Sequence, residues 1–310
     1  MAAKTNIFLT GATGYIGGSI LVRFLDRQDF PSLNITALVR SPEKAQKLQG
    51  LGINAVTGSF EDLALVEKLA SEADIVINAG LQRRHQGTGV VPKLIHTSGT
   101  AVLAEDAAGL YAYETIYDDS DPYQIEALPP TQVHRLIDLA VIAADKDEGY
   151  VKTYIILPSL IYGIATGKLV DLEVQNPYSI LVPLLVAASL ERGQGGVVGE
   201  GKNIWPNVHI DEIADLYLIL YDSIHANKDI GHGREGIYFG ESDEHTFYDL
   251  SKEISKALVE IGRGESEEPT TFTKEEIVKY FFIYDEMPII SRPSLLPNSN
   301  VDLELVNADK

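Results

Sequence analysis

The 310-residue sequence has no cysteine and a single tryptophan, and its basic residues are scarce beside its acidic ones. The absence of cysteine excludes disulfides, thiolate zinc sites and a cysteine nucleophile. With 25 Lys and Arg against 45 Asp and Glu, the formal net charge is −20. This charge argues against nucleic acids and anionic membrane surfaces as partners, because both need clustered cations.

Long apolar runs are missing as well. The most apolar segment, 178–190, is too short to span a bilayer. The apolar run 7–9 near the N-terminus enters a glycine-rich loop, which is unlike a secretory signal. We therefore expect a cytoplasmic protein without a membrane segment. A hydrophobic content of 45% with 23% charged residues is typical of a packed globular chain.

Short apolar runs alternate with helical patterns over the first 160 residues. The alternation predicts an α/β fold with a doubly wound parallel Rossmann sheet, because parallel strands need crossover helices. We expect strands at 6–10, 34–39, 53–57, 75–78, 93–97 and 151–157. We expect helices between them at 16–27, 42–51, 60–71 and 131–147, the third one capped by Ser59. The connection 78–93 is short for a crossover, and it leaves room only for a stunted helix around 81–85.

After Gly163 the pattern changes, and glycine and proline interrupt the chain. We expect a dinucleotide-binding domain over 1–163 and a small mixed C-terminal substrate lobe over 164–310, from which short segments are free to return to the sheet. Helical patterns in the lobe run over 211–223, 247–261 and 274–282. Thr273 and Glu276 form a capping box for the last of these helices.

A glycine-rich loop follows the first expected strand and opens the first expected helix. Gly11 allows a sharp turn, Gly14 lets the backbone approach a pyrophosphate, and Gly17 allows close packing of helix on strand. Amides at the helix N-terminus then bind the phosphates. The predicted cofactor contacts from this loop are Gly11, Thr13, Gly14, Tyr15, Ile16 and Gly17.

The end of the second expected strand indicates which dinucleotide binds. NAD sites usually place a carboxylate there to accept hydrogen bonds from the ribose. Here Arg40 and Ser41 follow the strand, with Lys44 one turn later. A cation beside a hydroxyl suits the 2′-phosphate of NADP. The sequence favours NADP and leaves NAD open, because an Arg at a strand end can also face solvent.

Four further motifs follow in order: Asn78-Ala79-Gly80 and the segments 95–100, 157–163 and 208–214. With these and the glycine loop, residues 5–260 resemble the extended short-chain dehydrogenase/reductase family, which includes sugar-nucleotide epimerases, dehydratases and dihydroflavonol-type reductases. The resemblance implies further cofactor contacts at Asn78, Ala79, Gly80, Pro158 and Ile161.

In that family a Ser or Thr after the fifth strand orients the substrate oxygen, a role that the resemblance gives to Ser98. A Tyr acts as general acid or base there, and a Lys four residues later lowers its pKa. The segment 131–140, where this pair should stand, contains neither Tyr nor Lys. Tyr248 and Lys252 have the right spacing but lie too late in the chain.

By distance to the sixth strand, His134 falls at the Tyr position and Asp138 at the Lys position. Residues four apart on a helix face the same way, and an imidazole titrates near neutrality without a neighbouring cation. Ser98, His134 and Asp138 are therefore the candidate catalytic residues. The alternative is that catalysis was lost and His134 is an ordinary polar helix residue.

The sequence thus predicts an NAD(P)-dependent oxidoreductase or epimerase/dehydratase-like enzyme. It would act on a small organic substrate as a monomer or homodimer. The alternative is an NADP-binding redox sensor without turnover. The seven histidines have no metal-binding spacing, so we expect no metal.

Overall fold

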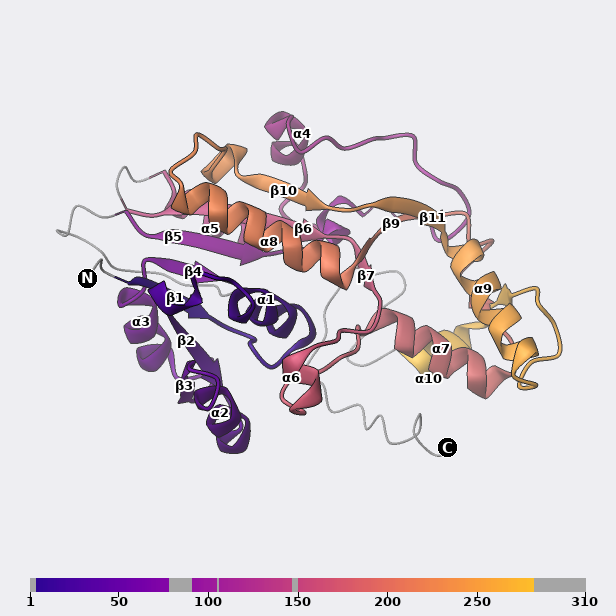
Figure 1. Ribbon diagram of the computed structural model, residues 1–310. Coiled ribbons are helices and arrows are strands. Elements are labelled where there is room, and N and C mark those ends of the chain that lie inside the picture. Colours follow the sequence, from indigo (N-terminus) through magenta and orange to yellow (C-terminus); the bar gives the residue numbers. More distant parts are fainter. Residues whose placement is uncertain (1–3, 78–90, 105, 147–149, 282–310) are drawn as a thin grey trace.

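The computed structural model describes residues 4–77, 91–104, 106–146 and 150–281. Within them, seven parallel strands form a central sheet in the order β10-β6-β5-β4-β1-β2-β3 (Figure 1). The strands are β1 (Thr5–Leu9), β2 (Leu33–Val39), β3 (Asn54–Thr57), β4 (Ile75–Ile77), β5 (Lys93–Thr97), β6 (Lys152–Pro158) and β10 (Ile237–Gly240). The predicted doubly wound parallel sheet is confirmed, and its strand order reverses at β1.

Helices cover both faces of the sheet. On one face lie α1 (Tyr15–Leu25), α2 (Pro42–Gln49) and α8 (Ile210–His225). On the other lie α3 (Leu63–Ser71), α4 (Pro122–Glu126) and α5 (Arg135–Ala144). The described residues also form three short 3₁₀ turns: η1 (Phe30–Ser32), η2 (Thr100–Leu103) and η3 (Gly233–Glu235).

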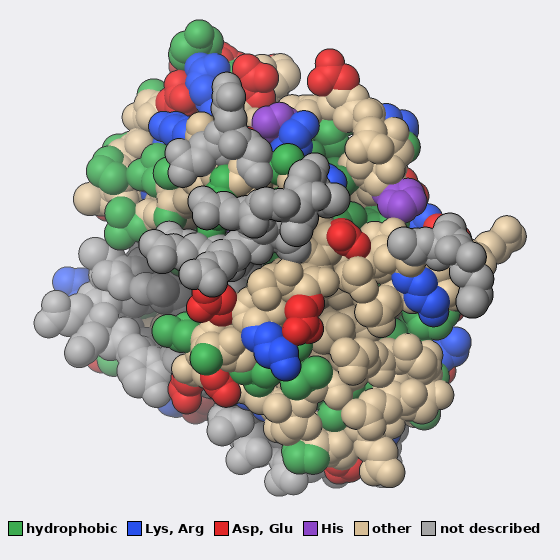
Figure 2. All heavy atoms as spheres, turned by 90° about the vertical axis from the view of Figure 1, so that its left-hand side faces the viewer, with side chains coloured by type: hydrophobic (Ala, Val, Ile, Leu, Met, Phe, Trp, Pro, Cys, Tyr) green, Lys and Arg blue, Asp and Glu red, His purple; other side chains and the backbone are tan. Residues whose placement is uncertain are grey.

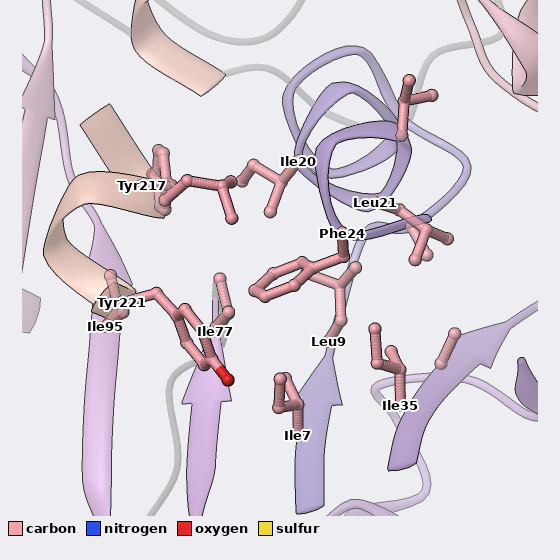
Figure 3. Close-up of a cluster of buried hydrophobic side chains, with 14 of the residues drawn as sticks. Ile7, Leu9, Ile20, Leu21, Phe24, Ile35, Ile77, Ile95, Tyr217 and Tyr221 are labelled. Atoms are coloured by element: carbon pink, nitrogen blue, oxygen red, sulfur yellow. The ribbon is translucent and has the colours of Figure 1, made fainter. Parts of the chain in front are cut away.

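The first face is held by the packing of α1 against α8. Figure 3 shows Phe24 of α1 and Tyr221 of α8 meeting above the strands, and their rings cross edge to face with centroids 5.0 Å apart. Both side chains are fully buried, and burying a side chain of this size stabilises the fold by about 2 kcal/mol. At the rim, Arg23 forms ion pairs with Asp211 and Asp215, each at 2.7 Å. Helix α8 is thus a part of the layer that surrounds the sheet.

A smaller lobe lies beyond the carboxyl ends of the strands (Figure 1). It contains a sheet of β7 (Leu160–Tyr162), β9 (Ile204–His209) and β11 (Asp243–Thr246), and a strand pair of β8 (Gly196–Val197) and β12 (Thr270–Thr271). Its helices are α6 (Lys168–Asp171), α7 (Leu181–Arg192), α9 (Phe247–Glu260) and α10 (Lys274–Phe281). Leu185, Phe247, Phe272 and Phe281 form the centre of its separate core. Each strand of the three-stranded sheet is joined within three residues to a core element: β7 to β6, β9 to α8 and β11 to β10.

Two predicted helix starts are wrong. Helix α3 begins at Leu63 rather than 60, because Asp62 Oδ1 accepts a hydrogen bond from the Leu65 amide at 3.0 Å and caps it. Ser59 accepts instead from the Glu61 amide in the preceding turn, at 3.3 Å. Helix α5 begins four residues later than predicted.

The predicted capping box of α10 is confirmed. The Thr273 amide donates to Glu276 Oε2 at 2.8 Å, and the Glu276 amide donates to Thr273 Oγ1 at 3.2 Å.

On the face shown in Figure 2, Lys and Arg side chains are scattered among acidic and apolar ones. No helix in the described part of the chain is long and apolar enough to cross a membrane.

Candidate active site

The glycine loop turns between β1 and α1 with the geometry that a pyrophosphate site needs. Gly11 adopts a φ of 66°, in the left-handed region that favours glycine. Its carbonyl accepts a hydrogen bond from the Gly14 amide at 2.8 Å. A Cβ on Gly17 would lie 2.3 Å from the Gly11 oxygen, so only glycine lets α1 start this close to the strand.

The N-terminus of α1 is left without a side-chain cap from the described residues, and its first turn contains no carboxylate. Its first amides, which include those of Ile16 and Gly17, therefore remain able to donate to an anion, where the helix dipole also favours negative charge. The loop fits the pyrophosphate of a dinucleotide.

A segment of the lobe holds this loop by hydrogen bonds. The Tyr15 hydroxyl donates to the Gly163 carbonyl at 2.6 Å, and the Asn176 amide donates to the Thr13 carbonyl at 3.0 Å. Gln175 donates from Nε2 to the Tyr15 carbonyl at 3.0 Å and to Ser19 Oγ at 2.8 Å. The loop is therefore held by hydrogen bonds before any ligand arrives.

The other predicted cofactor residues lie on several elements. Arg40 is exposed directly after β2, and Ser41 caps α2 by accepting from the Lys44 amide at 3.3 Å. Pro158 ends β6, and Ile161 lies in β7. The predicted contacts Asn78, Ala79 and Gly80, and the connection that follows them, lie outside the described residues.

Ser98 and Asp138 are in direct contact. Ser98 follows β5, and its Oγ donates to Asp138 Oδ2 at 2.9 Å. Asp138 lies in the first turn of α5 and is only 3% exposed. A carboxylate at this depth must be hydrogen-bonded or neutralised, so the serine is part of what holds it.

His134 precedes α5 as its N-cap residue rather than lying within the helix. Its φ of 64° is in the left-handed region, which costs a non-glycine residue free energy and is frequent at functional sites. Its carbonyl accepts from the Asp138 amide at 3.1 Å. Its ring lies beside Gly99, because a Cβ added to Gly99 would lie 3.3 Å from the His134 Nε2 atom. The structure thus brings His134 and Asp138 to the two consecutive residues Ser98 and Gly99.

Two buried polar residues complete this cluster, and neither was predicted from the sequence. His96 in β5 is 9% exposed, and its Nε2 lies 3.8 Å from Asp138 Oδ1. Arg135 is 2% exposed. Within the described residues, His96 Nδ1, Asp138 Oδ1, and Nε and Nη1 of Arg135 have no hydrogen-bond partner. A histidine among buried strand positions was the sequence signal that could have revealed the cluster.

Burial shifts the acid–base behaviour of these groups. It raises the pKa of the Asp138 carboxyl to about 6, against the opposing effects of the Ser98 hydrogen bond and the Arg135 charge. It lowers the pKa of His134 below the usual histidine value. Burial, reinforced by the neighbouring His134, lowers the pKa of His96 to about 4. At neutral pH both imidazoles are therefore uncharged.

Comparison with known proteins identifies the family. A sequence profile described as NAD(P)H-binding matches residues 11–120. An oxidase of Acremonium sp., Oxidase ucsJ, is 31% identical over 287 residues, which cover 83% of this chain and 79% of that protein. A UDP-N-acetylglucosamine 4-epimerase structure from Methanobrevibacter ruminantium superposes with a TM-score of 0.55 at 16% identity, covering 88% of this chain and 86% of that one. The chain belongs to the extended short-chain dehydrogenase/reductase family.

A second, more distant relative is also named for redox chemistry. A Stigmatella aurantiaca ketoreductase, named for a 4-hydroxy-2-methyl-3-oxo-4-farnesyl-3,4-dihydroquinoline-1-oxide substrate, is 26% identical over 119 residues. The match covers 32% of this chain and 34% of that protein. The protein therefore has the NAD(P)-binding fold of this dehydrogenase/reductase family, with relatives named as oxidase and reductase.

The Tyr-x-x-x-Lys spacing that occurs late in the chain belongs to the lobe and not to the Ser98 cluster. Tyr248 and Lys252 are on α9 of the lobe, where Glu268 accepts hydrogen bonds from both. In the described part of the chain, no group of three or more His, Asp or Glu side chains is arranged to hold a metal ion.

Proposed function

We propose that this protein is an NADP-dependent oxidoreductase that interconverts an alcohol and a carbonyl group on a small organic substrate. The observation that carries the proposal is that the His134 ring lies beside Gly99, the residue that follows Ser98. This position lies at the carboxyl edge of the sheet, where the glycine loop also lies. Ligands of open α/β sheets bind at this edge.

In the proposed mechanism, Ser98 and His134 share the reacting oxygen of the substrate. NADP, which the glycine loop and Arg40 would hold, would supply the hydride acceptor for alcohol oxidation and, in its reduced form, the hydride donor for carbonyl reduction. As the C–H and O–H bonds of the alcohol break, His134 accepts the hydroxyl proton at Nε2, and the electrons of the O–H bond form the C=O bond. Ser98 holds the oxygen in place. In the reverse direction His134 returns the same proton to the oxygen.

An imidazole suits this task without the lysine that the family's tyrosine needs. A phenol with a pKa near 10 is mostly protonated at neutral pH and is a poor base. Burial lowers the pKa of His134, so its ring is neutral at pH 7 and ready to accept a proton. Asp138, at the position of the family's lysine, is then not needed to bind the ribose. Its carboxyl instead accepts the hydrogen bond of Ser98.

The names of the relatives support redox chemistry over epimerisation. The Acremonium relative is named an oxidase, and the Stigmatella relative is named a ketoreductase. Arg40 and Ser41 support NADP over NAD, because a guanidinium and a hydroxyl beside the adenosine ribose suit a 2′-phosphate.

A His134→Ala variant tests the proposal. Turnover is measured with NADP and NADPH on a panel of secondary alcohols and ketones, and nucleotide binding is measured by calorimetry. We expect turnover to fall by about 10²–10⁴-fold, the usual contribution of a general acid or base, while nucleotide binding stays within a factor of about three. His225→Ala, which changes an exposed histidine stacked on Tyr221, should match the wild type. If the wild-type protein binds the nucleotide but turns over no member of the panel, the redox sensor is favoured instead.

A further inference from the structure

We propose that His96 is a positioning residue, which acts through Asp138 to set whether Ser98 has a hydrogen to donate to the substrate oxygen. The part of this inference that concerns substrate rests on the proposed function, because it needs Ser98 to touch the reacting oxygen. The part that concerns His96, Asp138 and Ser98 stands on their geometry alone.

The Asp138 carboxyl lies between the serine and the histidine. Its Oδ2 accepts from Ser98 Oγ at 2.9 Å, while Oδ1 faces His96 Nε2 at 3.8 Å. Oδ1 has no hydrogen-bond partner among the described residues. Since the carboxyl is 3% exposed, bulk water does not screen it. Burial and the groups beside it therefore determine the charge of the carboxyl.

The charge on Asp138 fixes the direction of the Ser98 hydrogen bond. An ionised carboxylate is an acceptor only, so Ser98 must donate its single hydrogen to it. The serine then has no hydrogen left for the substrate oxygen, and an alcohol cannot donate to it instead, because its one hydroxyl hydrogen goes to His134. A protonated Asp138 can itself donate to Ser98, which releases the serine hydrogen for the substrate oxygen. One proton on a buried side chain thus determines whether Ser98 can hold the substrate oxygen.

The charged groups around Asp138 come from three elements. On α5 the guanidinium of Arg135 favours the ionised carboxyl, and His134 is neutral at pH 7 because burial lowers its pKa. On α4, Glu126 lies near Arg135 and binds Arg234 at 2.6 Å. On β5, His96 faces the carboxyl at 3.8 Å. Because the pKa of His96 is lowered to about 4 and that of Asp138 is raised to about 6, Asp138 takes up a proton before His96 does as the pH falls.

A neutral His96 acts on Asp138 through its ring dipole. The tautomer with hydrogen on Nε2 points a donor at the unpartnered Oδ1 atom and is favoured beside a carboxylate. This donor stabilises the ionised form and opposes the effect of burial. Removing it must therefore raise the pKa of Asp138, whereas a neutral amide with an N–H group in the same place should preserve it.

Carbon-13 NMR of protein labelled at the aspartate γ-carbon tests this directly, and it needs neither cofactor nor turnover. The resonance that disappears in Asp138→Asn identifies the Asp138 carboxyl. We expect the Asp138 carboxyl to titrate with a pKa of about 6 in the wild type, and about half a pH unit or more higher in His96→Leu. His96→Gln, which keeps a neutral donor, should return it to within about 0.2 units of the wild type. Ser98→Ala should also raise it, because the serine donates to the ionised form.

These outcomes separate the two proposals. An unchanged Asp138 midpoint in His96→Leu would overturn the role of His96, and a lowered midpoint in Ser98→Ala would overturn the direction of the serine hydrogen bond. His96→Gln guards against a general folding effect of the leucine variant. If turnover is found, its pH profile should move in parallel with the NMR midpoint in His96→Leu. A shifted midpoint without any turnover would instead contradict the oxidoreductase proposal alone.

Discussion

Two strand–helix junctions meet at the same edge of the sheet, and they differ in what holds them in place. The junction of β1 and α1 is built from backbone, with Gly11 in the left-handed region and no space for a Cβ on Gly17. The junction of β5 and α5 is built from side chains, namely Ser98, His134 and Asp138. The first keeps the family's pattern, and the second departs from it.

The difference follows from what each junction must supply. A pyrophosphate needs amides in a fixed arrangement, which only glycine permits where the helix touches the strand. An acid–base group needs only a proton at the right place and a suitable pKa, which different side chains can provide. A cofactor site is therefore expected to tolerate less change than the acid–base residues beside it.

The largest expected effect is at the glycine junction. Gly17→Ala places a methyl group 2.3 Å from the Gly11 carbonyl oxygen, so the helix must move away from the strand. We expect the dissociation constant for NADP to rise at least about 100-fold, with a loss of about 1–3 kcal/mol of stability. Calorimetric titration and urea unfolding measure the two effects. Gly50→Ala, whose Cβ would lie 3.3 Å from the Lys47 oxygen, should leave binding intact.

A smaller effect is expected at Arg40, the side chain proposed to contact the cofactor. Arg40→Glu places a carboxylate at the end of β2 and removes the cation proposed to bind the 2′-phosphate. A charge-assisted hydrogen bond contributes about 1.5–3 kcal/mol, so NADP binding should weaken about 10–100-fold. The affinity for NAD should be unchanged or higher. Lys68→Glu, the same charge change at an exposed position of α3, is the control. Equal losses for both nucleotides would show that Arg40 does not select between them.

The smallest effect concerns the backbone of the second junction. His134→Gly and His134→Ala both remove the imidazole, and they differ in their tolerance of the φ of 64°. Because a left-handed non-glycine residue costs about 1–2 kcal/mol, the glycine variant should be about 1 kcal/mol more stable in urea unfolding. At Leu136, in the regular part of α5, glycine should be the less stable of the pair. If the glycine variant is the less stable of the pair at both positions, His134 carries no backbone strain.

The sequence predicted the sheet because its strands carry their own signals. Runs such as Ile7 to Leu9 are apolar on both faces, as buried parallel strands must be. It did not predict β10, since a strand of four residues far from the others has no local signal that assigns it to the sheet. Helix α7 was missed because its apolar residues surround the helix and show little periodicity.

The site could be predicted only in part. Spacing to β6 was enough to bring His134 and Asp138 to Ser98. It could not show that His134 lies before α5, because a left-handed residue is imposed by tertiary contacts rather than by its own preference. Nor could it show the environment of His96 and Arg135, since burial at 9% and 2% exposure depends on elements distant in sequence.

The three short joints between the sheet layer and the lobe limit how the two can move. The chain passes from β6 to β7, from β9 to α8 and from β10 to β11 within at most three residues each time. Connections this short leave little slack for the lobe to slide along the sheet layer. Together with the hydrogen bonds from Gln175 and Asn176 to the glycine loop and α1, they keep the lobe in place over the carboxyl edge of the sheet.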